Sequence, residues 1–381
     1  MPSRECYDDP VPTSGTETRP NLFGLDRSAI EALMEALGEP RYRARQLYTW
    51  LYKKRAASFA AMTDIKKDLR ERLADTHELR WPEVADRQLS YDGTRKYLFR
   101  LDDGVTVESV SIPEETRRTI CISTQAGCPL ECAFCLTGIA GYKRNLKVWE
   151  ILGQVATVMA GAPPRKAPAG GRPAIGGELP WNVVVMGMGE PLLNYEATVG
   201  ALRILMDPRG FAIPPKKLTL STVGILPTLE KLMQEPVRPN LAISLHAPDA
   251  GLRRKLMPIE EKYSLEDVLA AAGRYPIPRG GRVTYEYVLL RGVNDGPAHA
   301  RALVRLLGGS RVKVNLIPLN PAAEIPFDPP TPEAVEAFVR TLADARITVS
   351  VRRPRGQDIL AACGQLHLRR APESARELAA L

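Results

Sequence analysis

Three of the six cysteines stand close together in AGCPLECAFCLTG, residues 126–138. Cys128, Cys132 and Cys135 have the spacing C-x3-C-x2-C. Thiolates are the usual ligands of iron–sulfur clusters, and three of them can hold a cluster while leaving one iron open to another ligand. A structural zinc ion usually takes four protein ligands, and the histidine nearest in sequence is His246. The spacing therefore predicts a cluster with an open iron, and the alternatives are zinc or three incidental thiols.

Two further cysteines lie outside this loop. Cys121 precedes the loop by seven residues, and Cys363 stands in RGQDILAACGQL near the end of the chain. On their own they are typical of small buried core residues. Cys6, in a polar segment, has no evident role. The glycine-rich GMGEP, residues 187–191, is by itself typical of a tight turn and becomes informative because it follows a strand-like segment after the cysteine loop.

The elements that must position these residues alternate from about residue 117 onward. Strand-like segments are followed by helical ones, which predicts parallel strands with helical crossovers. The strand-like segments are TICIST, NVVVM, KLTLST, LAISLH, VTYEYVLL and VKVNLIP. The helical segments lie near 147–160, 195–206, 226–235, 264–275, 297–308 and 331–345. The chain is therefore α/β, with six β-α units in an open doubly wound sheet or an incomplete barrel.

In either arrangement the reactive groups should sit at the C-terminal ends of the strands. The cysteine loop, GMGEP, STVG, SLHAP and IPLN all follow predicted strands directly. We therefore expect these segments to meet at one site.

The region before the alternation has a different character. Residues 1–20 are polar and predict a loose tail, and Ser28 and Glu31 have the spacing of a capping box at the start of a helix. Residues 41–75 predict further helix, and residues 82–112 predict short strands. Within 161–180, ten of twenty residues are Gly or Pro, which predicts a flexible insertion without chemistry.

Charge gives a weaker indication of the partner. The formal net charge is +8, which fits a nucleic-acid partner without requiring one. Residues 41–75 hold ten Lys and Arg against four Asp and Glu, interleaved with aromatic residues. A solvated helical face with core-filling aromatics explains this pattern, and so does an RNA-backbone surface. The segment alone favours the solvated face.

The sequence shows no signal peptide and no apolar run of membrane-spanning length, so we expect a cytoplasmic protein without a membrane partner. Cytoplasmic thiols stay reduced, so clustered cysteines indicate metal binding or catalysis before disulfides.

The cysteine spacing, the aromatic residue before the third cysteine and GMGEP resemble the radical S-adenosylmethionine (SAM) superfamily. The whole pattern resembles one of its families, the RlmN and Cfr methyltransferases, most closely RlmN. The matching segments are VESVSIPE, CISTQAGCPLECAFC, GMGEPLLN, LSTVG, LAISLHAP, NLIPLN and RGQDILAACGQL. The resemblance implies a partial (βα)6 barrel, a [4Fe-4S] cluster, two SAM molecules per turnover and methylation of an adenine of 23S rRNA.

The resemblance also implies roles for single residues. Cys128, Cys132 and Cys135 would hold the cluster. Cys363 aligns with the cysteine that one SAM methylates, Cys121 with the second catalytic cysteine, and Glu108 with the proton acceptor. The positions that align with SAM-contacting residues are Gly189, Glu190, Ser221, Ser244, Leu245, His246 and Asn320.

The implied chemistry explains why two extra cysteines are needed. The C2 carbon of adenine is electron-poor, so a radical can add to it where an ordinary methyl transfer fails. A carbon radical on S-methylated Cys363 adds to the base, and Cys121 then releases the product by forming a disulfide with Cys363. A cytosolic reductant must reopen that disulfide.

Several alternatives remain open at this point. Methylation of C8 of the same adenine, as in Cfr, uses the same motifs, and a tRNA adenine beside the anticodon is an open second substrate. A radical SAM enzyme acting on a small molecule needs neither Cys121 with Cys363 nor the basic arm. A binding module with a structural metal needs no SAM-contacting segments. We expect a monomer served by an electron donor such as flavodoxin or ferredoxin.

The resemblance divides the chain into four parts. They are a flexible tail, 1–20; an RNA-binding accessory domain, 21–112; a radical SAM core, 113–353, interrupted by the 161–180 insertion; and a C-terminal segment, 354–381, that carries the methyl-accepting cysteine.

Overall fold

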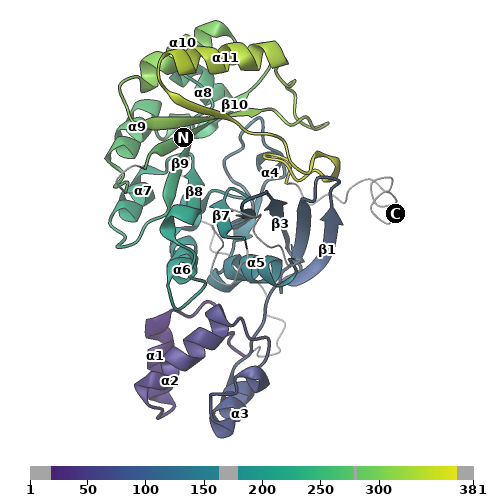
Figure 1. The fold of residues 1–381 in the computed structure, drawn as a ribbon, viewed down its shortest axis with the longest axis vertical. Helices are drawn as coiled ribbons and strands as arrows, with labels where there is room; N and C mark the ends of the chain where they lie inside the picture. The colour runs from purple at the N-terminus through teal and green to yellow at the C-terminus, as the bar shows by residue number, and fades with distance from the viewer. Residues whose placement is uncertain (1–18, 163–178, 279–280, 367–381) are drawn as a thin grey trace, which may run out of the picture.

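The computed structural model describes residues 19–162, 179–278 and 281–366. One sheet of ten strands, in the order β1-β2-β3-β4-β7-β8-β9-β10-β11-β12, organises the molecule (Figure 1). Most of the expected tail, most of the 161–180 insertion and the C-terminal segment after residue 366 lie outside the described residues.

Seven neighbouring strands of this sheet run parallel. They are β4 (Arg118–Ile122), β7 (Trp181–Val185), β8 (Leu218–Thr222), β9 (Asn240–Ser244), β10 (Val283–Leu289), β11 (Val312–Pro318) and β12 (Thr348–Val351). The first six match the predicted strands, and β12 was not predicted because it is short and only partly buried. In the described chain β1 and β12 are the two edge strands, so the sheet does not close, in agreement with the partial barrel that the resemblance implied.

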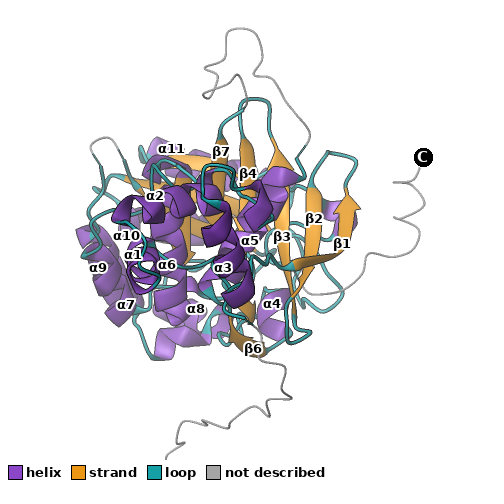
Figure 2. Cartoon of the chain, turned by 90° about the horizontal axis from the view of Figure 1, so that it is seen from below, coloured by secondary structure: helices purple, strands orange, loops and turns teal. Residues whose placement is uncertain are grey.

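A helix follows each of the first six parallel strands. These crossover helices are α5 (Val148–Ala160), α6 (Tyr195–Met206), α7 (Leu226–Met233), α9 (Leu265–Arg274), α10 (Pro297–Leu307) and α11 (Pro332–Asp344). Each agrees with its predicted range to within about two residues, whereas the short α4 (Leu136–Ile139) and α8 (Ala250–Leu256) were not predicted. The helices pack their apolar faces against the outside of the sheet (Figure 2). The ends of the strands are therefore free to form the site.

Three antiparallel strands extend the same sheet beyond β4. They are β1 (Glu83–Leu89), β2 (Arg95–Arg100) and β3 (Thr106–Pro113). Because β3 pairs with β4, hydrogen bonding is continuous across residue 112, where the sequence placed a domain boundary. The predicted accessory region 21–112 thus combines a helical layer with strands that belong to the core sheet.

The helical layer lies below the barrel in Figure 1 and contains α1 (Arg27–Ala36), α2 (Arg41–Tyr48) and α3 (Lys67–Thr76). Its first helix begins two residues earlier than the predicted capping box. Asp26 is the N-cap, and its carboxylate accepts a hydrogen bond from Ala29 N at 2.9 Å. Ser28 instead donates to Asp26 and Glu31 pairs with Arg41, so the predicted cap is wrong.

Aromatic and charged side chains dock this layer onto the core. Tyr48 and Tyr52 are buried, as the core-filling interpretation predicted, whereas Tyr42 is exposed. The Asp207 carboxylate, at the end of α6, forms an ion pair with Arg27 at 2.6 Å and accepts a hydrogen bond from the Tyr48 hydroxyl at 3.2 Å. The helical layer is therefore tied to α6 by buried packing and by charge.

None of the helices within the described ranges is both long and apolar enough to cross a bilayer.

Candidate active site

Two adjoining cavities open at the C-terminal ends of the parallel strands. The cysteine-loop cavity, of about 180 Å³, lies against the predicted cluster loop. The barrel cavity, of about 610 Å³, reaches from that end into the barrel and passes Cys121. Both are lined by Cys135, Asn320 and Cys363, so the segments expected to meet at one site do meet.

The cysteine loop is held by backbone hydrogen bonds to three distant segments. Cys128 N donates to Gly141 O at 3.1 Å, and Ala133 N donates to Leu256 O at 3.0 Å. Leu136 N donates to Gly364 O at 2.9 Å, which joins the loop to the segment that carries Cys363. Chain far apart in sequence therefore fixes the loop on the barrel rim.

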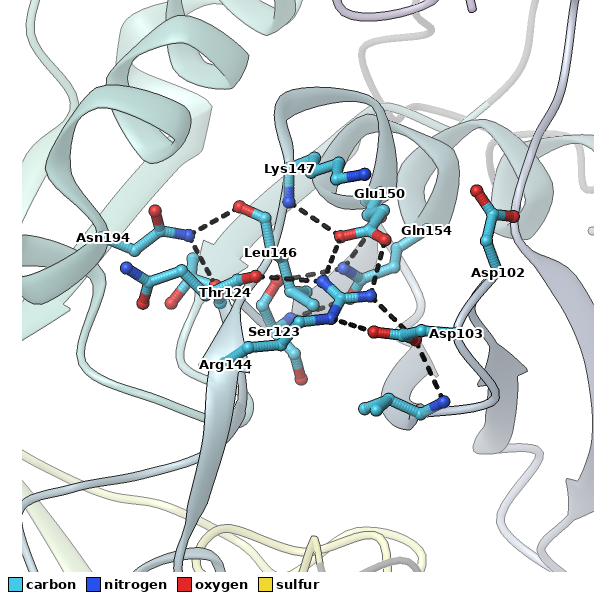
Figure 3. A network of polar contacts seen from close by, with 12 residues as sticks. Asp102, Asp103, Ser123, Thr124, Arg144, Leu146, Lys147, Glu150, Gln154 and Asn194 are labelled. Atoms are coloured by element: carbon cyan, nitrogen blue, oxygen red, sulfur yellow. Dashed lines mark hydrogen bonds and ion pairs between the residues drawn. The ribbon is translucent and has the colours of Figure 1, made fainter. Parts of the chain in front are cut away.

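A charged network fixes the ribbon that flanks the loop (Figure 3). This ribbon pairs β5 (Gln125–Gly127) with β6 (Tyr142–Asn145). Arg144 makes two hydrogen bonds to the buried Glu150 carboxylate, at 2.8 and 2.9 Å, and also pairs with Asp103 from the β2–β3 turn. The loop's support therefore comes partly from the antiparallel extension of the sheet.

Burial dominates the chemistry of the loop thiols. It raises the pKa of Cys128 to about 12 and raises the pKa of Cys132 well above its usual value. The negative charges of the neighbouring loop thiols raise both values further. Burial makes the thiolates of Cys128 and Cys132 costly to form without a metal, and iron bound to the sulfurs would remove that cost.

The glycine-rich segment approaches the loop very closely. Gly189 has φ +98°, and a Cβ atom there would lie 2.4 Å from Cβ of Gln125. The side-chain amide oxygen Oε1 of Gln125 accepts a hydrogen bond from Glu190 N at 2.8 Å. Only glycine fits this conformation and spacing, so the segment is built against β5.

The Glu190 side chain is buried and already holds three protein donors. Its carboxylate accepts hydrogen bonds from Thr222 Oγ1 at 2.7 Å, Val223 N at 3.0 Å and Leu192 N at 2.9 Å. Burial nevertheless raises its pKa to about 7, against the effect of these bonds. Glu190 therefore ties GMGEP to the STVG turn on the cavity wall.

His246 forms the opposite wall as a neutral imidazole. Its Nδ1 accepts a hydrogen bond from Val288 N at 3.0 Å, and burial, assisted by the charge of Arg253, lowers its pKa to about 3. The Phe134 ring packs edge-on against the imidazole, with ring centroids 4.7 Å apart. The aromatic residue before the third loop cysteine thus covers the cavity from one side.

The remaining SAM-aligned positions divide into lining and supporting residues. Ser221 and Ser244 line the cysteine-loop cavity. Asn320 lines both cavities, and its amide donates to Cys363 O at 3.3 Å. Leu245 is fully buried and its N–H donates to Glu286 O at 3.0 Å, so it supports the wall from behind.

The two cysteines outside the loop come from opposite ends of the core. Cys121 lies on β4, and burial raises its pKa to about 12, with a further increase from the charge of Cys363. Cys363 follows β12 and is exposed. Both line the barrel cavity, so the fold places two free thiols from distant segments in one space.

Glu108, the predicted proton acceptor, is buried on β3, which pairs with the strand that carries Cys121, and it is not among the residues that line the two described cavities. Its carboxylate pairs with Lys96 at 3.1 Å. The Lys96 ammonium also lies 3.5 Å from Leu360 O, in the segment before Cys363. Glu108 is thus connected to the Cys363 segment through one lysine.

Comparison with known proteins identifies the family of this chain. Residues 20–79 match the ribosomal RNA large subunit methyltransferase N-terminal domain, and residues 173–304 match the radical SAM superfamily. The dual-specificity RNA methyltransferase RlmN of Alcanivorax borkumensis is 43% identical over 349 residues, 91% of this chain and 90% of that protein. The chain belongs to the RlmN family.

Other RlmN proteins and a solved structure agree. The probable dual-specificity RNA methyltransferase RlmN of Gemmatimonas aurantiaca is 44% identical, over 94% of this chain and 97% of that protein. The crystal structure of a radical SAM methyltransferase from Sphaerobacter thermophilus superposes with a TM-score of 0.82 at 41% identity, and covers 91% of this chain and 99% of that one. The fold of this chain is therefore shared with a solved radical SAM methyltransferase.

The radical SAM superfamily, and with it the RlmN family, uses a [4Fe-4S] cluster and SAM. The donor set fits such a cluster better than one metal ion. In the described chain no three His, Cys, Asp or Glu side chains converge where they could hold a single ion. A four-iron cluster instead takes one thiolate per iron, so Cys128, Cys132 and Cys135 can remain apart around it.

Two charged residues of this RlmN-family site were not predicted from the sequence. Glu286 and Arg352 line both cavities. Glu286 offered one signal, because it interrupts the apolar strand VTYEYVLL. Arg352 offered none, because it stands in the basic run RRPR after a strand that was not predicted.

Proposed function

We propose that the chain is a radical SAM RNA methyltransferase that methylates C2 of an adenine in 23S rRNA and an adenine of tRNA. Membership of the RlmN family supports this activity, and the curated relatives are described as dual-specificity RNA methyltransferases. The observation that carries the proposal is that Cys121 and Cys363 line one cavity beside the three-cysteine loop. A radical SAM enzyme acting on a small molecule has no need for that second thiol pair.

Cys128, Cys132 and Cys135 would hold the cluster, and Gly189, Glu190, Ser221, Ser244, His246 and Asn320 would contact SAM. When bound, the cluster and SAM together supply a carbon-centred radical. The chain's own part is to shape a pocket from strand ends. Phe134 and His246 cover that pocket, and burial keeps the imidazole neutral.

Cys363 takes the methyl group of one SAM as a thioether, and its exposed position allows the base to reach it. The carbon on this sulfur, after loss of one hydrogen atom, adds to adenine C2. Glu108 accepts the ring proton, and the one electron that the adduct loses would go to the cluster. The Cys121 thiol then loses its proton and attacks the Cys363 sulfur, so that a disulfide forms and the sulfur–carbon bond breaks. The released methylene carbon takes up a proton and becomes the methyl group of the base.

The experiment is mass spectrometry of nucleosides from 23S rRNA and tRNA after anaerobic incubation with reconstituted enzyme, SAM and reductant. We expect 2-methyladenosine in both RNAs. An 8-methyladenosine peak would instead assign the Cfr-type reaction. SAM cleavage without any methylated adenosine would contradict the proposal.

The helical layer, residues 21–79, is the part we assign to RNA binding. The family model for the N-terminal domain matches almost the same range, and the strands that follow belong to the core sheet. We therefore place the domain boundary near residue 80, before β1, and keep the core to residue 353. A basic exposed face on these helices fits an RNA backbone.

Turnover also requires partners outside the chain. A reductant such as flavodoxin or ferredoxin would supply electrons to the cluster, and a thiol reductant would reopen the Cys121–Cys363 disulfide. We propose a monomeric cytoplasmic enzyme. Size-exclusion chromatography with light scattering tests the monomer.

A further inference from the structure

A guanidinium group lies beside the thiol that we assign as methyl acceptor. Arg352 directly follows β12, and its Nη1 donates toward the Cys363 Sγ atom at 3.7 Å. Its Nη2 lies 3.2 Å from the Met186 sulfur, on the wall that both cavities share. The positive charge is therefore placed next to the assigned acceptor sulfur in a partly exposed position, since the Arg352 side chain is 31% exposed.

The guanidinium is held in this position from behind. Arg352 N donates to Leu316 O at 2.8 Å, and its Nη2 lies 3.7 Å from the Glu286 carboxylate. Glu286 is buried on β10 and accepts a hydrogen bond from Asn315 Nδ2 at 2.9 Å. Since three parallel strands contribute to this support, the cation is part of the barrel frame.

The charged groups around Cys363 come from every neighbouring element. Within the described chain, the titratable groups that line the barrel cavity with Arg352 and Cys363 are Cys121 on β4, Cys135 in the cysteine loop, Glu286 on β10 and Lys313 on β11. The same cavity is also lined by Glu114, Arg117, Arg353 and Arg355. Among the cationic side chains that line this cavity in the described chain, Arg352 is the one with a described contact to the Cys363 sulfur.

We propose that Arg352 is a positioning residue that stabilises the thiolate of Cys363 during methyl transfer from SAM. This inference rests on the proposed function. In this step the Cys363 proton goes to solvent, the thiolate forms a bond to the methyl carbon, the carbon–sulfonium bond of SAM breaks, and S-adenosylhomocysteine leaves. No electron is gained or lost.

The charge balance of the pair explains why an arginine can serve here. A neutral thiol is a poor nucleophile, so the thiolate must be available close to neutral pH. SAM brings a positive sulfonium, which an isolated guanidinium would repel. Glu286 offsets the charge of Arg352, so the pair can donate a hydrogen bond to the thiolate without a net repulsion of SAM.

The test measures alkylation of unmethylated Cys363 by iodoacetamide in the cluster-loaded enzyme without SAM, quantified by peptide mass spectrometry across a pH series. Near neutral pH we expect Arg352→Gln to slow alkylation about tenfold, because the thiolate loses its charged hydrogen-bond donor. The rate should approach the wild-type rate as the pH rises. Arg352→Lys keeps the charge and should be slowed much less.

Arg353→Gln is the matched control because it removes the same charge from an exposed neighbour with no described contact to either thiol. An Arg352→Gln rate equal to wild type, or an equal loss in Arg353→Gln, would overturn the inference. Transfer of a CD3 group from labelled SAM to Cys363 should show the same order of variants.

The proposed function fails in a different way. If Cys363→Ala still methylates RNA, the assigned acceptor is wrong, whatever the alkylation rates show. If Cys363→Ala is inactive and Arg352→Gln is alkylated normally, the acceptor stands and only the role of Arg352 is lost.

Discussion

His246 is a buried histidine that the fold keeps neutral. Its folded pKa is about 3, below the usual 6.5 of the unfolded chain, because burial and Arg253 oppose the charged form. As the pH falls below 6.5, the unfolded state takes up a proton that the folded state refuses. His246 therefore contributes stability that is complete above pH 6.5 and is lost progressively as the pH falls towards 3.

We predict that His246→Asn removes this pH dependence, because the Asn carbonyl group can still accept from Val288 N but does not titrate. Between pH 7.5 and pH 5 the wild type should lose about 2 kcal/mol more unfolding free energy than the variant. Urea unfolding of the cluster-free protein under reducing conditions measures the difference. Parallel pH curves for the two proteins would contradict the assignment.

Single residues also show how far the sequence reaches. The spacing of Cys128, Cys132 and Cys135 is local, so it could be recognised in the chain itself. Cys121 and Cys363 lie more than two hundred residues apart, and only the resemblance to a family paired them. Arg352 and Glu286 could not be assigned, because their role depends on which strands become neighbours.

At the scale of elements, the close approach of GMGEP to β5 predicts a loss of unfolding free energy when a larger side chain is placed at Gly189. Gly189→Ala should bring its Cβ against Gln125 in a backbone region that alanine already disfavours. Gly104 has a similar φ of +79° but has no described atom within 4 Å of its would-be Cβ. Gly104→Ala should therefore lose about 1–2 kcal/mol from backbone strain alone, and Gly189→Ala clearly more.

Thermal unfolding of the two variants beside the wild type measures this difference. Gly189→Ala should also bind SAM more weakly, since GMGEP forms a wall of the cysteine-loop cavity. Equal losses in both variants would mean that the contact with Gln125 relaxes freely.

The sequence predicted the elements in which the apolar pattern repeats over many residues, and it missed those in which the pattern covers only a few. The crossover helices α5 and α6 match their predicted ranges closely, because their apolar faces extend over three turns. The four-residue β12 is marginal by any pattern and is specified by its pairing with β11. Asp26 is the N-cap, whereas the sequence predicted Ser28. Both residue types suit an N-cap, and the packing of the folded helix decides where the helix begins.

At the scale of the molecule, the RNA-binding surface that we propose is the exposed basic face of the helical layer. Arg45 and Lys53 are exposed, and they belong to the helical layer that lies below the barrel in Figure 1. We predict that the double change to Gln weakens tRNA binding. The slope of log K against log salt concentration should become less negative by about one to two, because one or two fewer phosphates are contacted. Filter binding across a salt series measures both.

Arg301 and Arg305 on α10 provide the control, because the same double change to Gln there removes the same charge from an exposed helix of the core. An equal effect of the two pairs would show that net charge acts without a defined surface. The anaerobic cleavage of SAM in the absence of RNA should be the same in both double variants.

The position of Cys363 in the chain has a consequence for biosynthesis. Every residue that we assign to the cluster and to SAM lies between residues 128 and 320, and the assigned methyl acceptor follows the last strand. A ribosome therefore completes the radical-generating half of the barrel before it adds the thiol that would bond to RNA. A prematurely terminated product would lack the means to attach itself covalently to the ribosomes that made it.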